Sequence, residues 1–266
     1  MIMRDSHTHL NQYPKSEIPE ILERARLAQV GFVVCAGTDI ASSRACVEIS
    51  ERYSGCYAGV GIHPMEVKGP VDDGVYSTLR DIAANNSGVV CVSEVGLDFL
   101  PQSPDREIQY QAFREQIRLA REMGLPIIFH SRESHPEVLR ILKEEKAYEV
   151  GGVMHYFQAD EATAKDAMDS GFYISLARPL LRLPELQEVA KNLPLDSLVL
   201  ETDAAPQPFK KYRHRWAEPR HVKDVAEKLA ELRGITLEEV AEITTGNLTR
   251  LLKLDPGIEP FETPSL

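Results

Sequence analysis

The 266-residue sequence has no long apolar run, no surplus of positive charge and no paired cysteine motif. A transmembrane helix needs about 18 or more apolar residues, and the first residues also lack the apolar centre of a signal peptide, so we expect a soluble, cytoplasmic protein without membrane contact. The formal net charge of -11 excludes a broad basic face for duplex nucleic acid, so any polyanion must be held locally. Cys35, Cys46, Cys56 and Cys91 show no C-x-x-C spacing and are expected to be structural and reduced.

Apolar segments typical of strands alternate with segments of helical period along most of the chain. A first short strand ends at His7, and further strands are expected at 31–37, 56–63, 89–96, 126–130, 152–157, 172–176 and 197–202. Helices are expected at 16–29, 39–53, 75–85, 105–123, 135–146, 161–170, 183–192, 220–233 and 237–252. Eight strands alternating with helices predict an α/β protein with the (β/α)8 TIM barrel fold. We expect a single barrel domain over residues 1–254, followed by a Pro-rich, irregular C-terminal tail at 255–266.

Two histidines stand one residue apart at the end of the first predicted strand. Because side chains alternate between the two faces of a strand, His7 and His9 are expected to point the same way, with Ser6 and Thr8 on the other face. One such pair is a weak signal, since most His-x-His pairs are packed or exposed. The pair gains weight only if other metal-binding side chains occur at the ends of later strands.

Such side chains occur at the ends of most of the later strands. The C-terminal ends of all barrel strands converge on one face, where active sites are built. Chance does not readily place so many metal-binding side chains at the same end of successive strands. The residues that the barrel would bring together with His7 and His9 are His63, Glu94, His130, His155 and Asp203.

The motifs around these residues resemble those of the TatD-related metal-dependent deoxyribonucleases, within the amidohydrolase-like metallo-hydrolase barrels. They are Asp5-Ser-His-Thr-His-Leu10, Gly61-Ile-His-Pro64, Glu94-Val-Gly-Leu-Asp98, His130-Ser-Arg132, His155-Tyr-Phe157 and Leu200-Glu-Thr-Asp-Ala204, and the resemblance covers residues 1–254. It implies a binuclear metal centre in which Glu94 bridges. His7, His9 and Asp203 would hold one ion, and His130 and His155 the other. It also implies phosphodiester hydrolysis, with DNA as the partner, as single strands or 3′ ends.

The chemistry of these side chains agrees with that implication. A bridging carboxylate with imidazoles on both sides can hold two divalent ions about 3.5 to 4 Å apart, which suits a phosphoryl displacement by an acidified water. Asp203 would serve both as a ligand and as the general base, so Glu94 and Asp203 are the predicted catalytic residues. His63 and Arg132 are left to bind the substrate, because a guanidinium fits a phosphate bidentately. Nitrogen and carboxylate ligands suit Zn, Mn, Co or Fe, and relatives are often treated as Mg-dependent.

Several other residues have two interpretations each. Arg132 is equally typical of an ion-paired rim residue, and Asp98 either orients a ligand or lies on the surface. Asp5 and Glu201 are expected to pair with a neighbouring histidine or lysine below the metals, and His135 and His221 to be exposed. Tyr156, Phe157 and Trp216 either stack on bases or form the pocket wall. The dense cationic cluster 210–216, which contains Lys210, Lys211, Arg213 and Arg215, either tracks a nucleic-acid backbone or is a solvated loop.

Three departures from the family pattern fall in loops over the predicted pocket. They are Gln158-Ala159, Ala177-Arg178-Pro179 and the placement of proline in Ala204-Ala-Pro-Gln-Pro. They leave the predicted ligands intact but bear on the substrate. The favoured function is a metal-dependent deoxyribonuclease of the exonuclease type, without an obligate protein partner. Metal-dependent hydrolysis of small amides, esters or phosphoesters, and an idle barrel that binds a partner, are the alternatives. The complete ligand set argues against the idle barrel, and the lack of an obvious bridging lysine on the fifth strand argues against the amide and ester hydrolases.

Overall fold

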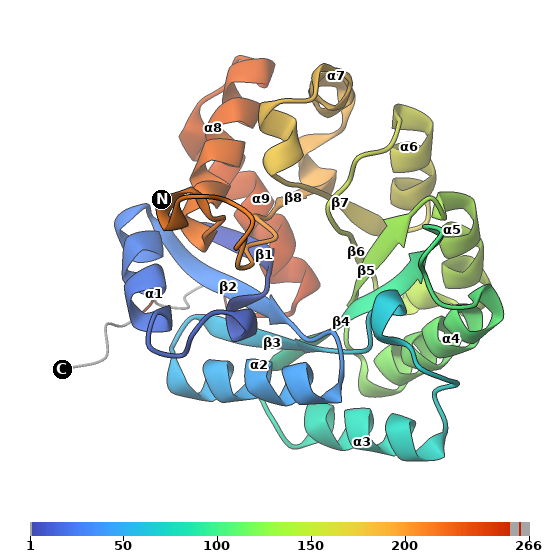
Figure 1. The fold of residues 1–266 in the computed structure, drawn as a ribbon. Helices are drawn as coiled ribbons and strands as arrows, with labels where there is room; N and C mark the ends of the chain where they lie inside the picture. The colour runs from blue at the N-terminus through green and yellow to red at the C-terminus, as the bar shows by residue number, and fades with distance from the viewer. Residues whose placement is uncertain (1, 256–260, 262–266) are drawn as a thin grey trace.

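The computed structural model of the chain describes residues 2–255 and residue 261. Eight parallel strands form one sheet in the order β1 to β8, so each strand pairs with its neighbour in sequence (Figure 1). The strands are β1 (Met3–Thr8), β2 (Val30–Ala36), β3 (Cys56–Val60), β4 (Val89–Asp98), β5 (Ile127–Arg132), β6 (Gly152–Met154), β7 (Phe172–Leu176) and β8 (Leu198–Leu200).

The first and last strands meet and nearly close the sheet into a barrel. Just beyond β8, the amide of Asp203 donates to the carbonyl of His7 at 3.0 Å, and the amide of His9 donates to the carbonyl of Ala204 at 2.8 Å. A parallel bridge joins Thr8 to Ala204. The predicted TIM barrel is therefore confirmed. Apart from Asp255 and Phe261, the predicted Pro-rich tail lies outside the described residues.

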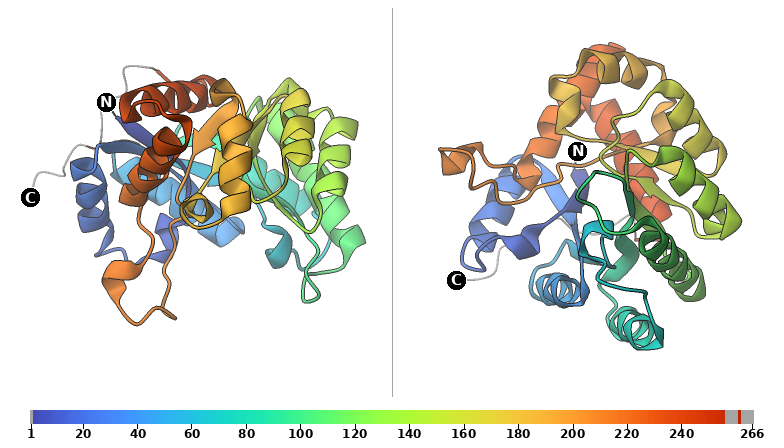
Figure 2. Two further views of the ribbon diagram at one scale, coloured as in Figure 1. Left: turned by 90° about the horizontal axis from the view of Figure 1, so that it is seen from above. Right: turned by 45° about the vertical axis from the view of Figure 1, so that its right-hand side comes forward.

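Helices surround the barrel and connect successive strands (Figure 2). Polar side chains set several of their N-termini: Asp39 accepts from the amide of Ser42, and Asp105 accepts from the amides of Glu107 and Ile108. None of the helices in the part of the chain described here combines the length and apolar character needed to cross a membrane. The helices are α1 (Ile18–Leu27), α2 (Ile40–Arg52), α3 (Asp73–Ala84), α4 (Arg106–Met123), α5 (His135–Glu144), α6 (Glu161–Asp169), α7 (Pro184–Asn192), α8 (Val222–Arg233) and α9 (Leu237–Leu251).

One end of the barrel is packed with apolar side chains, which leaves the other end for polar ones. Residues early in their strands, including Phe32, Ile128 and Val199, form a buried cluster with Leu248 and Leu251 of α9. His130 stands two residues after Ile128 in β5, and Glu201 stands two residues after Val199, just past β8. Side chains two residues apart lie on the same face of a strand. The packed end therefore supports a polar layer at the C-terminal ends of the strands.

Two register shifts occur beside the residues of greatest interest. In β1, Asp5 pairs with Val33 of β2 and Thr8 pairs with Cys35, so β1 has one extra residue between these two pairs. Between Val92 and Val95, β4 likewise has one residue more than β5 has between Ile127 and Phe129. Such bulges re-aim side chains and are common next to active sites.

Candidate active site

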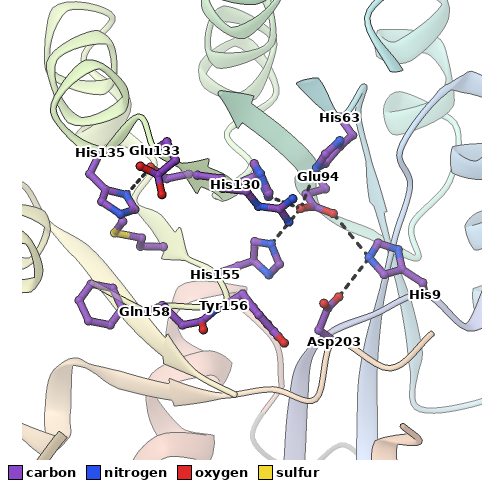
Figure 3. A pocket seen from close by; sticks show the side chains of 14 residues that line it. His9, His63, Glu94, His130, Glu133, His135, His155, Tyr156, Gln158 and Asp203 are labelled. Carbon is purple, nitrogen blue, oxygen red and sulfur yellow. Dashed lines mark hydrogen bonds and ion pairs between the residues drawn. The ribbon is translucent and has the colours of Figure 1, made fainter. Parts of the chain in front are cut away.

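A cavity of about 600 Å³ opens at the C-terminal ends of the strands (Figure 3). Seven of the eight residues predicted for the site line it. His7, the eighth, is fully buried beside Glu94. The residues that line the cavity are His9, His63, Glu94, His130, Ser131, Arg132, Glu133, His135, Met154, His155, Tyr156, Phe157, Gln158 and Asp203.

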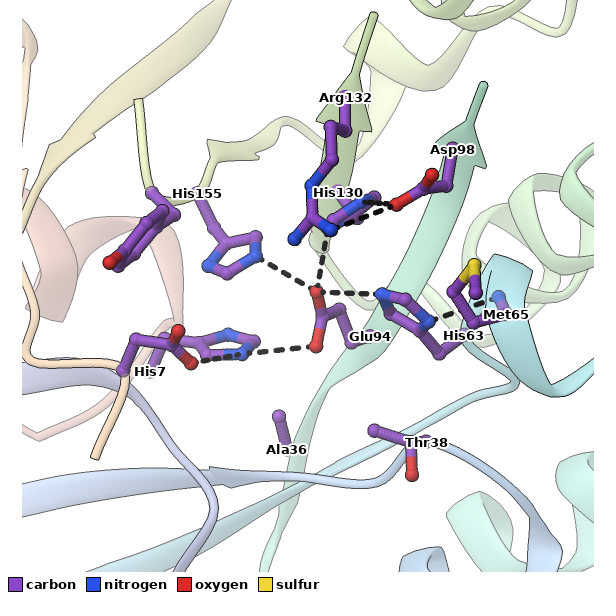
Figure 4. Close-up of polar contacts among 12 residues, drawn as sticks. His7, Ala36, Thr38, His63, Met65, Glu94, Asp98, His130, Arg132 and His155 are labelled. Carbon is purple, nitrogen blue, oxygen red and sulfur yellow. Dashed lines mark hydrogen bonds and ion pairs between the residues drawn. The ribbon is translucent and has the colours of Figure 1, made fainter. Parts of the chain in front are cut away.

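The carboxylate of Glu94 lies at the centre, and its two oxygens face different histidines (Figure 4). Oε2 lies 3.4 Å from Nε2 of His7 and 3.5 Å from Nε2 of His9. Oε1 lies 2.8 Å from Nε2 of His155 and 3.1 Å from Nδ1 of His130. One carboxylate thus divides four imidazoles into two pairs, one at each oxygen.

Three of these imidazoles are oriented by an acceptor on the ring nitrogen that faces away from Glu94. Nε2 of His130 lies 2.9 Å from Oδ2 of Asp98, Nδ1 of His155 lies 3.2 Å from Oε1 of Glu201, and Nδ1 of His9 lies 3.3 Å from the carbonyl of Ala36. A neutral imidazole carries one proton, and the outer acceptor fixes that proton on the nitrogen that faces it. The other nitrogen, which faces Glu94, keeps its lone pair, as in metal-bound histidines with an outer carboxylate or carbonyl.

His7 provides the test of whether this site fits a metal ion. Its side chain is fully buried, and neither ring nitrogen has a hydrogen-bond partner among the described residues. A buried polar atom without a partner is costly and calls for an explanation. A cation between His7, His9 and Glu94 would satisfy Nε2, since ligand atoms of these three residues lie within 4.8 Å of one another. The residues present therefore fit a divalent ion.

His63 also approaches Glu94, but its hydrogen bonding distinguishes it from the other histidines. Its Nε2 lies 3.4 Å from Oε1 of Glu94, and it forms a second possible metal-binding group with Glu94 and His130. However, its Nδ1 accepts from the amide of Met65 at 3.1 Å, so the proton of the neutral ring is on Nε2. An N–H cannot ligate a metal ion, but it can donate to a phosphate oxygen. This geometry favours a substrate contact over a metal ligand.

Asp203 completes the group from the far end of the chain. Its Oδ1 lies 3.3 Å from Nε2 of His9 and 4.0 Å from Nε2 of His7. Burial opposes the charged forms, yet Asp203 and Glu94 raise the pKa of His9 to about 9, and His9 with its neighbours lowers the pKa of Asp203 to about 2. The backbone of Asp203 is left-handed, with φ of 50°, an unfavourable conformation for a non-glycine residue that is typical of functional sites. The carboxylates of Glu94 and Asp203 thus form an anionic centre that favours a positively charged group beside them.

The end of β5 adds two further polar groups. Half of the Arg132 side chain is exposed to the cavity, and its guanidinium lies 3.5 Å from Asp98. Asp98 is buried and also accepts from the hydroxyl of Ser103 at 2.6 Å. Of the two interpretations of Asp98, a surface position is therefore wrong, and its contact with His130 orients that imidazole.

The structure corrects two expectations about neighbouring residues. His135 was expected to be exposed, but it is the first residue of α5 and lines the cavity, with Nδ1 2.7 Å from the hydroxyl of Ser131. Asp5 was expected to pair with a histidine or lysine side chain, but its carboxylate accepts from the amides of Thr202 and His7. A hydrogen bond to a strand amide depends on register, which side-chain spacing does not reveal.

The aromatic and cationic candidates also separate. Tyr156 lines the cavity, whereas Phe157, although in contact with the cavity, is almost fully buried in the core. Trp216 packs with Tyr13 under the guanidinium of Arg213. Arg213 itself pairs with Glu17 at 2.6 Å and with Glu218 at 3.3 Å, so this member of the cationic cluster stabilises the loop.

Comparison with known proteins places the chain in a family. The family model "TatD related DNase" matches residues 4–253. An uncharacterized metal-dependent hydrolase, YabD of Bacillus subtilis, is 38% identical over 94% of this chain and 99% of its own length. Deoxyribonuclease TATDN3 of Homo sapiens is 31% identical, with 93% of both chains covered. The crystal structure of YJJV, a TatD homologue from Escherichia coli, superposes with a TM-score of 0.86 at 28% identity, covering 95% of this chain and 98% of that one. The chain therefore belongs to the TatD related DNase family of metal-dependent hydrolases.

Proposed function

We propose that the protein is a divalent-metal-dependent deoxyribonuclease of the exonuclease type with a binuclear metal centre. The observation that carries this proposal is the division of four imidazoles between the two oxygens of Glu94. His7 and His9 face Oε2, with Asp203 beside His9, and His130 and His155 face Oε1. This is the arrangement expected when one carboxylate is shared by two ions.

Nitrogen and carboxylate donors suit Zn, Mn, Co or Fe, and Mg is compatible with the carboxylates. When bound, two such ions supply Lewis acidity toward the phosphoryl group and a more acidic water. The chain's own residues then have separate tasks. The Nε2–H of His63 and the guanidinium of Arg132 hold non-bridging phosphate oxygens, and Asp203, whose carboxylate borders the cavity, accepts a proton from the attacking water.

DNA as the substrate is supported by the deoxyribonuclease name of the human relative, and a cytoplasmic location by four free, buried thiols. The test is a panel of substrates with Mn, Zn, Mg, Co or Fe added to metal-stripped protein. The panel comprises single-stranded DNA labelled at either end, a chromogenic phosphodiester, an amide and a lactone. We expect metal-dependent cleavage of the phosphodiesters and stepwise shortening of DNA from its 3′ end. Turnover of the amide or lactone alone would contradict the proposal and favour a small-molecule hydrolase.

The role of Asp203 gives a sharper test. Asp203→Asn keeps the size of the side chain but cannot accept the proton, so kcat for the phosphodiester should fall by about 10²- to 10⁴-fold while KM changes much less. Loss of a metal ligand would add to this effect. The matched control is Asp160→Asn, which removes an exposed N-cap carboxylate of α6. Full activity of Asp203→Asn would exclude both roles assigned to this residue.

A further inference from the structure

Two arginines in the connection after β7 have no acidic partner in the part of the chain that the structure describes. Arg178 begins the short 3-10 turn Arg178–Leu181, and Arg182 follows it. The Nε of Arg178 is buried and donates to no acceptor among residues 2–255 and 261. Within the same residues, no carboxylate oxygen forms an ion pair with either guanidinium, whereas many other arginines of this chain are paired. A buried guanidinium nitrogen without a partner is costly unless an anion occupies the space beside it.

Arg178 follows β7, the strand next to β8, and the 3-10 turn that it begins packs against α8. Burial raises the pKa of Tyr13, which follows β1, and the positive charges of Arg213 and Arg178 oppose that shift. Burial and then Arg178 lower the pKa of Lys210, in the loop after β8. Burial, Arg178 and Arg220 in turn lower the pKa of His221, at the end of that loop. Arg178 therefore acts on groups that follow β1 and β8, the two strands whose ends carry His7, His9 and Asp203.

The charges of both arginines also affect Tyr156, a residue that lines the cavity. Burial and the carboxylates of Asp203 and Glu201 raise the pKa of Tyr156, and Arg182 and Arg178 oppose this shift. Arg178 stands two residues after Leu176, the end of β7, and Arg182 follows the turn, so both arginines lie at the C-terminal end of the barrel, where the cavity opens. The loop from residue 204 to 221, orange in Figure 2, projects from the barrel.

Glu218, the buried acid beside the loop after β8, is already engaged by other cations. Glu218 is buried and contacts Arg24 at 2.8 Å, Arg220 at 3.2 Å and Arg213 at 3.3 Å. Three guanidinium groups around one carboxylate leave no negative charge to neutralise Arg178. The rim thus carries a local excess of positive charge on a protein whose net charge is -11.

We propose that Arg178 and Arg182 form a second phosphate subsite, which binds the phosphate next to the one cleaved at the metal centre. A guanidinium donates two parallel hydrogen bonds to a phosphate, so a half-buried arginine whose Nε has no hydrogen-bond partner among the described residues suits this ligand. The inference rests on the proposed function and names its substrate class more narrowly. The substrate is the end of an oligonucleotide with at least two phosphates, rather than an isolated phosphodiester.

The test compares two substrates of the metal-loaded protein. Thymidine 5′-(p-nitrophenyl phosphate) has one phosphodiester, and single-stranded pentathymidylate has several phosphates. Arg178→Gln should raise KM for pentathymidylate by about 10- to 100-fold, as expected for a lost charge-assisted hydrogen bond, and leave KM for the small ester nearly unchanged. Each lost phosphate contact should also flatten the log–log salt dependence of pentathymidylate binding by about 0.7.

Arg52→Gln is the matched control, because Arg52 ends α2 on the opposite face of the barrel, is exposed and has no ion pair among the described residues. Arg178→Lys should fall between wild type and Arg178→Gln, since it keeps the charge and loses the fork. Thermal melting of each variant shows whether it folds. Equal changes for both substrates, or an unchanged KM and salt slope for pentathymidylate, would overturn the subsite.

A binding measurement separates this inference from the proposed function. Fluorescence anisotropy of labelled pentathymidylate on metal-free protein needs no turnover. If the wild-type protein hydrolyses neither substrate, the proposed function fails. Weaker binding by Arg178→Gln, but not by Arg52→Gln, would then still support a polyphosphate-binding rim. Equal binding by both variants and the wild type would exclude it.

Discussion

Asp98 provides a quantitative test of the metal centre without altering any proposed ligand. Its Oδ2 lies 2.9 Å from Nε2 of His130, whose Nδ1 faces Oε1 of Glu94. Asp98→Asn presents either an amide N–H or a weaker, neutral acceptor to Nε2. The amide N–H would favour the tautomer with the proton on Nδ1, and that proton would occupy the position needed by the metal ion.

The expected magnitude follows from two independent considerations. Loss of a hydrogen bond to a charged group costs about 1.5 to 3 kcal/mol, which corresponds to about 10- to 150-fold in affinity. Mutations of groups that orient metal-binding histidines typically cost about 10- to 100-fold. We therefore expect Asp98→Asn to weaken the binding of one of the two proposed ions by about 10- to 100-fold. The affinity for the proposed ion near His7 and His9 should stay almost unchanged.

Competition with a chromogenic chelator measures the two affinities separately. The control is Ser103→Ala, which removes another partner of Asp98, at 2.6 Å, but keeps the contact with His130. Thermal melting of both variants excludes general unfolding. If both ions retained their affinity in Asp98→Asn, the tautomer argument would be wrong. If both ions weakened equally, the assignment of separate histidine pairs to the two oxygens of Glu94 would be wrong.

Three further predictions concern metal content and stability. Glu94→Ala should lose both ions in elemental analysis, whereas His130→Ala should lose mainly one; two retained ions in Glu94→Ala would contradict the shared ligand. Glu218→Gln should lower the free energy of unfolding by about 2 kcal/mol in urea denaturation, less than for a fully buried pair because Arg24 is partly exposed. Burial opposes ionisation of Glu218, but Arg24, Arg220 and Arg213 lower its pKa, so this stabilisation is present above the usual carboxyl pKa and disappears as the pH falls below it. The wild-type advantage over Glu218→Gln should therefore shrink in acid, and a constant difference down to pH 3 would refute it. Gly96→Ala would place Cβ 2.0 Å from the carbonyl oxygen of His130, at a φ of 140°; we expect about 2 to 4 kcal/mol of destabilisation, and an unchanged melting temperature would contradict this.

Sequence patterns predicted the barrel and the approximate location of most of the site. Strand alternation in His7-x-His9 and the convergence of strand ends account for that success. Two strands are shorter than predicted: β3 ends at Val60 and β6 at Met154. His63 and His155 therefore lie just beyond their strands, yet both still line the cavity.

Other features depend on pairings between distant segments, which local patterns do not encode. The pair between Arg213 and Glu17 joins residues 196 positions apart. The sequence therefore does not reveal that this arginine of the cationic cluster is ion-paired in the fold. The tautomers of His63 and His130 depend on the amide of Met65 and on Asp98, and the division of histidines by Glu94 depends on a bulge in β4. In the sequence, Arg178 was visible only as a departure from the family pattern, because its lack of an acidic partner among the described residues is a property of the folded chain.

The seam between β1 and β8 has a consequence for synthesis of the protein on the ribosome. The amide of Asp203 bonds the carbonyl of His7, so the bond that joins the two ends of the sheet also brings the last proposed ligand to the first. A nascent chain that has emerged only through its seventh strand lacks this carboxylate and has an unpaired β1 edge. Contacts that span almost 200 residues also form late, after the local helices and strands. Each newly made molecule should thus gain hydrolase activity in a single step once β8 has joined the barrel, rather than gradually as the chain emerges.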